Sequence, residues 1–121
     1  MARIMVVDDS PTDVANLRNM LSKAGHTVLE AGGAEEAIER IRAEMPDCVV
    51  MDVVMPGVNG FQATRTLSKD PATANIPIVV VSAKSQETDR VWALRQGARE
   101  YLVKPVKEAD LLSRINTVLN G

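Results

Sequence analysis

The chain has 121 residues, of which 45% are hydrophobic, enough to bury one core without the help of disulfides. Its formal charge of -2 and its three aromatic side chains offer neither the basic surplus nor the stacking surface for binding nucleic acid. No apolar stretch approaches membrane-spanning length, and the N-terminus lacks the pattern of a signal peptide. The single cysteine, Cys48, lies in an apolar run and should pack as a small hydrophobe. We therefore expect one cytoplasmic domain over residues 1–121, without membrane insertion and without nucleic acid as a partner.

Short apolar runs alternate with longer amphipathic segments along the whole chain. Ser10 and Pro11 supply an N-cap and a first-turn proline for the first helix, Gly25 and Gly97 stop two helices, and Pro46 closes a third segment. In chain order the pattern predicts a strand over 3–8, a helix over 11–24, a strand over 27–31, a helix over 34–44, a strand over 47–52, a loop over 53–58, a helix over 59–69, a strand over 76–81 ended by Ser82, a helix over 86–96, a strand over 100–103 and a helix over 107–120.

Strict alternation of strands and helices predicts an α/β fold, a doubly wound parallel sheet of five strands with five helices on its two faces. Parallel strands need crossover connections, and right-handed crossovers place the helices where they cover the sheet. Ligands of such sheets bind at the carboxyl ends of the strands. The residues that fall at those ends are Asp8, Asp9, Asp52, Ser82 and Lys104.

Clustered acids at the ends of apolar strands are the strongest chemical signal in the chain. Carboxylates that converge on one edge of a sheet repel each other, which makes them a natural site for a divalent cation and a basic partner. Each residue alone has an ordinary explanation: Asp8 and Asp9 could favour a helix N-terminus, and Ser82 could bond the backbone. Several such residues arriving together at predicted strand ends favour a site for phosphoryl chemistry.

Four segments resemble the receiver domain of two-component response regulators, in order and spacing, over essentially the whole chain. These segments are Val7-Asp8-Asp9-Ser10, Met51 to Gly57, Val81-Ser82-Ala83-Lys84 and Gly97 to Pro105. The resemblance implies a flavodoxin-like, CheY-like sheet with strand order 2-1-3-4-5. Within the family, residues 59–65 and 86–92 look most like the stand-alone PilH-type regulators of type IV pilus twitching motility.

The resemblance implies a role for each site residue. Asp52 would be the phosphoryl acceptor, an assignment that also suits the chemistry of a carboxylate nucleophile. Asp8, Asp9, Asp52 and the backbone carbonyl of Val54 would hold Mg²⁺. Lys104 would contact the phosphoryl oxygens from the opposite side, next to a cis peptide bond to Pro105. 

Three further positions complete the set that the resemblance implies. Ser82 would donate a hydrogen bond to the phosphoryl group, and Ala83 would leave room for that group. Movement of Ser82 would draw Tyr101 inward and so carry the signal to the surface. A tyrosine in a strand and a tryptophan on a helix are more often packing residues, but the position of Tyr101 three residues before Lys104 matches the switch position of the family, whereas Trp92 has no such support. We read His26 as a solvated loop residue.

The expected partners are a CheA-like histidine kinase and a downstream protein target, for which the pilus motor machinery is a candidate. The protein would be no enzyme beyond catalysing its own phosphorylation and hydrolysis. A phosphate sink for a shared kinase is an alternative within the same class. A small aspartate-nucleophile phosphatase is an alternative of another class, but such enzymes place a second acid where this chain has Val54. A nucleotide-binding module is disfavoured because the chain lacks both common glycine-rich phosphate loops.

Overall fold

The computed structural model describes residues 1–55, 57 and 59–121. Pro56 and Val58, which fall in the predicted loop over 53–58 and in the motif that follows Asp52, lie outside the described residues. The strands are β1 (Arg3–Val7), β2 (Thr27–Ala31), β3 (Cys48–Met51), β4 (Ile78–Ser82) and β5 (Glu100–Val103). The helices are α1 (Pro11–Lys23), α2 (Ala34–Glu44), α3 (Gly60–Lys69), α4 (Glu87–Gln96) and α5 (Glu108–Asn120).

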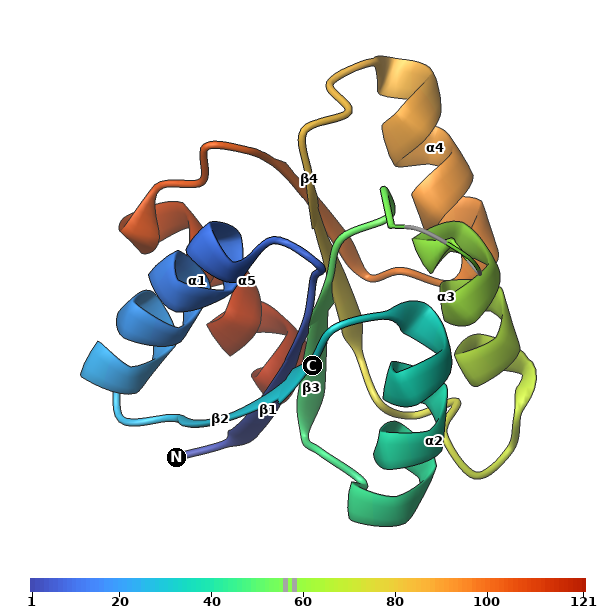
Figure 1. Cartoon of the computed structure of the whole chain (residues 1–121), viewed down its shortest axis with the longest axis horizontal. Helices are drawn as coiled ribbons and strands as arrows, with labels where there is room; N and C mark the ends of the chain where they lie inside the picture. Colours follow the sequence, from blue (N-terminus) through green and yellow to red (C-terminus); the bar gives the residue numbers. More distant parts are fainter. Residues whose placement is uncertain (56, 58) are drawn as a thin grey trace.

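The five strands form one parallel sheet in the order β2-β1-β3-β4-β5 (Figure 1). This order confirms the predicted doubly wound sheet. The winding reverses between β1 and β3, and ligands of doubly wound sheets bind at the carboxyl ends of the strands at such a point. The fold thus puts the ends of β1 and β3 beside each other at the place where a ligand is expected.

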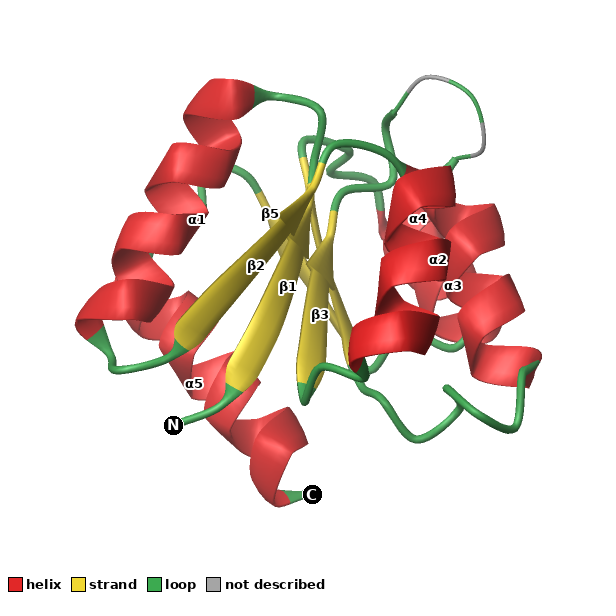
Figure 2. Cartoon of the chain, turned by 60° about the horizontal axis from the view of Figure 1, so that its bottom comes forward, coloured by secondary structure: helices red, strands yellow, loops and turns green. Residues whose placement is uncertain are grey.

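Helices cover both faces of the sheet, with α1 and α5 on one face and α2, α3 and α4 on the other (Figure 2). Side chains of a strand alternate between the faces, so β1 contributes Met5 and Val7 to one core and Ile4 and Val6 to the other. Because both faces are covered, the central strands are almost wholly apolar, and every residue of β3 and β4 is buried.

Strand boundaries differ from the prediction by one or two residues in β1, β3 and β4. The sequence predicts a strand from Ile76, but β4 begins at Ile78 because Pro77 has no N–H to donate to the sheet, although its carbonyl still accepts the N–H of Val49 at 2.9 Å. The sequence also places Asp8 and Asp52 inside strands, whereas β1 ends at Val7 and β3 at Met51. The carboxylates therefore project from the edge of the sheet.

A glycine lets the start of α3 approach the end of β3 closely. A Cβ atom at Gly60 would lie 2.3 Å from the backbone oxygen of Asp52 and 2.6 Å from the Cα of Val53. Asn59 caps the helix through its side-chain oxygen, which accepts the N–H of Gln62 at 2.9 Å. The segment behind Asp52 is thus held at a distance that no larger residue at position 60 would permit.

Candidate functional site

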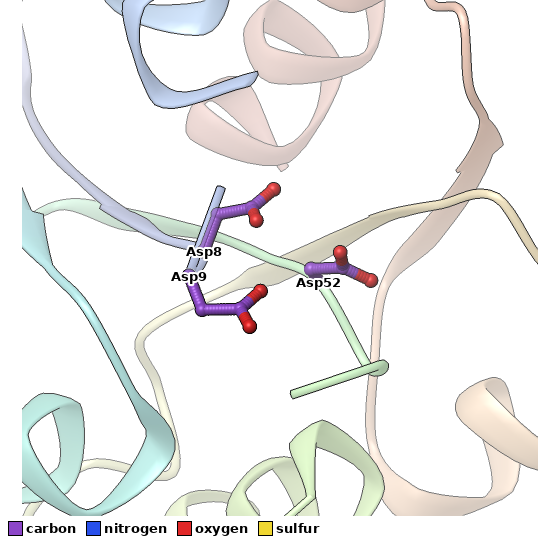
Figure 3. A group of neighbouring side chains, drawn as sticks. All are labelled: Asp8, Asp9 and Asp52. Atoms are coloured by element: carbon purple, nitrogen blue, oxygen red, sulfur yellow. The ribbon is translucent and has the colours of Figure 1, made fainter. Parts of the chain in front are cut away.

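Three carboxylates gather at the carboxyl ends of β1 and β3. Asp8 and Asp9 follow β1, Asp52 follows β3, and one oxygen from each lies within 4.8 Å of the others (Figure 3). Asp8 and Asp52 are buried, whereas Asp9 is exposed. The adjacent pairing of β1 with β3 brings together residues that are more than 40 positions apart in the sequence. The parallel sheet is therefore the direct cause of the cluster.

Backbone N–H groups fix the orientation of the two buried carboxylates. Oδ1 of Asp8 accepts the N–H of Ser10 at 2.9 Å, and Oδ1 of Asp52 accepts the N–H of Val54 at 3.0 Å. Each of these hydrogen bonds holds one carboxylate oxygen and leaves the second oxygen free to point elsewhere. In both residues that second oxygen faces the same cation.

The cation is the ammonium of Lys104. Its Nζ lies 2.8 Å from Oδ2 of Asp8 and 3.0 Å from Oδ2 of Asp52, and its backbone N–H donates to the carbonyl of Ser82 at 2.8 Å. The side chain is only 15% exposed. Burial lowers the pKa of Lys104, but hydrogen bonds to its carboxylate partners outweigh burial and hold the pKa above its usual range. Lys104 therefore stays charged and neutralises part of the acidic edge.

Asp13 is the site residue that the sequence reasoning missed. Its Oδ2 lies 2.8 Å from Nζ of Lys104, from the first turn of α1. The hydrogen bond to Lys104 lowers the pKa of Asp13. The sequence did hold a usable signal, because Asp13 is an acid in the first turn of a helix that starts two residues after Asp9.

The remaining predicted site residues surround this centre. Ser82 is fully buried, and its Oγ accepts the N–H of Lys84 at 3.2 Å. Ala83 is exposed, next to the end of β4. The peptide bond from Lys104 to Pro105 is cis, as the resemblance implies.

Tyr101 is buried in β5, and its hydroxyl donates to the carbonyl of Lys84 at 2.7 Å. The hydrogen bond joins the strand to the loop that follows Ser82. Burial raises the pKa of the tyrosine hydroxyl, which therefore remains a hydrogen-bond donor. The switching role stays a prediction, and the contact gives it a physical connection to that loop.

Trp92 and His26 lie outside the carboxylate cluster, and the structure tests how each was interpreted from the sequence. Trp92 is 50% exposed on α4 and so is not a core residue. His26 was expected to be solvated, but it is half-buried and its Nδ1 accepts the N–H of Ala2 at 3.1 Å. This correction arises because the turn after α1 packs against the start of β1, where the backbone N–H of Ala2 needs an acceptor.

The oxygen donors at this edge suit a hard divalent cation. Carboxylates are the ligands preferred by Mg²⁺ and Ca²⁺, and the exposed position of Asp9 leaves room for the water molecules that Mg²⁺ keeps. Side chains of cysteine and histidine, which softer metals prefer, are absent from the cluster within the described part of the chain. The residues present therefore fit the magnesium that the resemblance implies.

The comparisons with known proteins place the chain in a family. The family model of the response regulator receiver domain matches residues 4–116. The chain therefore belongs to the receiver domains of two-component response regulators, which confirms the resemblance. The helices of the described residues include none that is long and apolar enough to span a membrane.

Individual relatives agree with this family. The chain is 57% identical to Protein PilH of Pseudomonas aeruginosa over 121 residues, which covers the full length of both. It is 35% identical to Response regulator PleD of Caulobacter vibrioides over 117 residues, which is 26% of that longer protein. Among solved structures it is similar to chemotaxis protein CheY4 of Vibrio cholerae, with a TM-score of 0.90, 26% identity and 98% of each chain covered.

Proposed function

We propose that the chain is a stand-alone response regulator that accepts a phosphoryl group on Asp52 from a CheA-like histidine kinase. The observation that carries this proposal is the buried carboxylate of Asp52 at a strand end, within 3.0 Å of the Lys104 ammonium and beside two further acids. In these surroundings the Asp52 carboxylate can attack phosphorus while the Lys104 ammonium balances the negative charge that develops on the phosphoryl oxygens.

The chain's own residues perform most of the transfer. A carboxylate oxygen of Asp52 attacks phosphorus, the bond from phosphorus to the donor breaks, and an acyl phosphate forms. Lys104 then donates hydrogen bonds to the phosphoryl oxygens, as does the Ser82 hydroxyl, and Ala83 leaves the space that the group needs. Asp8, Asp9, Asp52 and the Val54 carbonyl would hold Mg²⁺, which supplies positive charge next to the transferred group when it is bound.

The output of the domain is a change of surface. The acyl phosphate would accept a hydrogen bond from Ser82 and so pull the end of β4 toward Asp52. The loop after Ser82 is joined to β5 by the hydrogen bond from the Tyr101 hydroxyl to the carbonyl of Lys84. A shift of a few kcal/mol in such a contact is enough to change which conformation a small domain populates. The altered surface of α4, β5 and α5 would bind or release a protein target in the cytoplasm.

The pilus assignment rests on similarity to PilH-type regulators. The identity of 57% over the full length of Protein PilH supports a related role in type IV pilus twitching motility, with the pilus motor machinery as candidate target. A phosphate sink that drains a kinase shared with a sister regulator would use the same chemistry. The two roles differ in whether the phosphorylated protein binds a target.

The first test is the intact mass of the protein after incubation with acetyl phosphate and Mg²⁺. We expect the gain of one phosphoryl group, lost in Asp52→Asn and in samples with EDTA, and retained in Asp47→Asn, which changes an acid at the other end of β3. Labelling of Asp52→Asn, or no labelling of the wild-type protein, would refute the assignment. Repeated release of phosphate from a small ester, at many equivalents per protein, would favour a phosphatase instead.

Cellular function can be tested in Pseudomonas aeruginosa that lacks PilH. Expression of this chain should restore twitching across a surface, and its Asp52→Asn variant should not. Equal restoration by both proteins would mean that phosphorylation is dispensable for the role. Absence of restoration by the wild-type chain at matched expression would count against the pilus assignment while leaving the receiver chemistry untouched.

A further inference from the structure

The ammonium of Lys104 has three protons, and three carboxylates accept them. The acceptors are Asp8 at 2.8 Å, Asp13 at 2.8 Å and Asp52 at 3.0 Å from Nζ. A lysine ammonium offers three donors and no more. Lys104 can therefore contact a phosphoryl oxygen only after it gives up one of these partners.

The three acceptors differ in what else they do. Asp8 and Asp52 belong to the carboxylate cluster that fits a divalent cation, and their side chains are 1% and 8% exposed. Asp13 stands outside that cluster, on α1, and its side chain is 38% exposed. When a cation is coordinated by oxygens of Asp8 and Asp52, Lys104 can still keep its hydrogen bond to Asp13.

We propose that Asp13 is a positioning residue, which holds the Lys104 ammonium over the acidic edge while Asp8 and Asp52 turn to the metal ion and the phosphoryl group. The role rests on the proposed function and deepens it. One retained hydrogen bond fixes the long, flexible lysine side chain, and the two released protons then point at the phosphoryl oxygens. The position of Lys104 is thereby independent of the residues that take part in the transfer.

Loss of Asp13 has two consequences that run in the same direction. Lys104 is then shared between Asp8 and Asp52 alone, so it competes more strongly for the oxygens that the cation needs. The acidic edge also loses one negative charge, which weakens its attraction for a cation. Mg²⁺ should bind less tightly, and the transfer should be slower even when Mg²⁺ is saturating, because Lys104 is less well placed.

Asp13 could act only by stabilising the N-terminus of α1, and the chain offers a matched control variant for that effect. Asp13 is the third residue of α1, where any acid would favour the helix N-terminus. Asp110 is the third residue of α5, it is exposed, and among the described residues it forms no ion pair. Asp110→Asn therefore removes the same charge from the same helical position without touching Lys104.

The experiment compares wild type, Asp13→Asn, Asp13→Glu and Asp110→Asn, after circular dichroism has established that each is folded. Calorimetric titration gives the dissociation constant for Mg²⁺, and intact mass against time gives the rate of phosphorylation by acetyl phosphate at saturating Mg²⁺. A third measurement needs no metal: nuclear magnetic resonance of the Lys104 ammonium reports how fast its protons exchange with water.

We expect Asp13→Asn to weaken Mg²⁺ binding and to slow phosphorylation, each by about three- to tenfold, the effect of one half-exposed charged hydrogen bond. The Lys104 protons should exchange several-fold faster in the metal-free variant. Asp13→Glu, which keeps the carboxylate, should lie close to wild type in Mg²⁺ affinity, phosphorylation rate and proton exchange. Asp110→Asn should match wild type in all three.

Equal values for Asp13→Asn and wild type, or equal losses in Asp13→Asn and Asp110→Asn, would overturn the proposal. Failure of Asp13→Glu to restore any of the three quantities would also count against it. If the wild-type protein accepts no phosphoryl group, the proposed function is wrong, and the metal titration and proton exchange still decide whether Asp13 positions Lys104.

Discussion

Replacement of Lys104 by methionine should destabilise the metal-free protein and tighten its binding of Mg²⁺. The substitution keeps an unbranched side chain, one heavy atom shorter than that of lysine, but leaves Asp8 and Asp52 buried without their cation. At separations of 2.8 and 3.0 Å, each pair contributes roughly 6 kcal/mol of attraction at an effective dielectric constant of about 20. The cost of removing the ammonium from water offsets much of this attraction, so we expect a net loss of about 3–5 kcal/mol in the free energy of unfolding.

Urea denaturation with EDTA and with Mg²⁺ measures this effect. Mg²⁺ stabilises the folded protein according to its affinity, and each tenfold gain in affinity narrows the gap between Lys104→Met and wild type by about 1.4 kcal/mol. The variant should bind Mg²⁺ at least about tenfold more tightly, since its competitor for the carboxylates is gone. The stability gap should therefore be smaller in Mg²⁺ than in EDTA.

Lys23→Met is a suitable control, because Lys23 pairs with Glu108 at the surface and its side chain is 66% exposed. That change should cost less than about 1 kcal/mol, with or without Mg²⁺. The reasoning fails if Lys104→Met is as stable as wild type in EDTA. It fails equally if the stability gap is the same in both conditions, since Lys104 would then not compete with a cation.

Val54→Asn should shorten the lifetime of the phosphorylated state, because the half-exposed valine cannot orient an attacking water and asparagine can; an unchanged decay by intact mass would contradict this. Gly60→Ala should cost at least about 2 kcal/mol in urea denaturation, since its Cβ would overlap the Asp52 carbonyl, and a wild-type midpoint would refute the overlap. Burial and the N-terminal ammonium lower the pKa of His26 below 6.5, so the unfolded chain binds more protons and stability should fall as the pH drops from neutrality through this lowered pKa. His26→Asn, which can still accept the N–H of Ala2, should flatten that dependence, and an equal slope would assign it to another group.

The order of elements and the edge that carries the site followed from the sequence, because both depend on patterns that are local. Alternation of apolar runs with amphipathic segments predicts a parallel sheet, and a parallel sheet places all strand ends at one edge. Asp8 and Asp52 could therefore be assigned to one cluster without knowledge of their distance. Pro77 moved the start of β4, since a missing N–H outweighs the preference of Ile76 for strands.

Contacts that depend on the path of a side chain or of a loop could not be predicted. The hydrogen bond that Lys104 donates to Asp13 joins residues 91 positions apart, and it requires both the turn of α1 and the reach of the lysine. The bond from the Tyr101 hydroxyl to Lys84 depends on the course of the loop after β4. His26 likewise acquires its partner only when the turn after α1 meets the N-terminal segment.

Both ends of the described chain lie at the amino edge of the sheet, opposite the carboxylates (Figure 2). Met1 and Gly121 even line the same hollow, together with His26 and Arg99. A fluorescent protein or an affinity label joined at either end would consequently be carried on the far side of the molecule. Such a fusion leaves the approach to Asp52 open, and the N-terminus is the better place for it, because the C-terminus directly follows α5, which belongs to the proposed target surface.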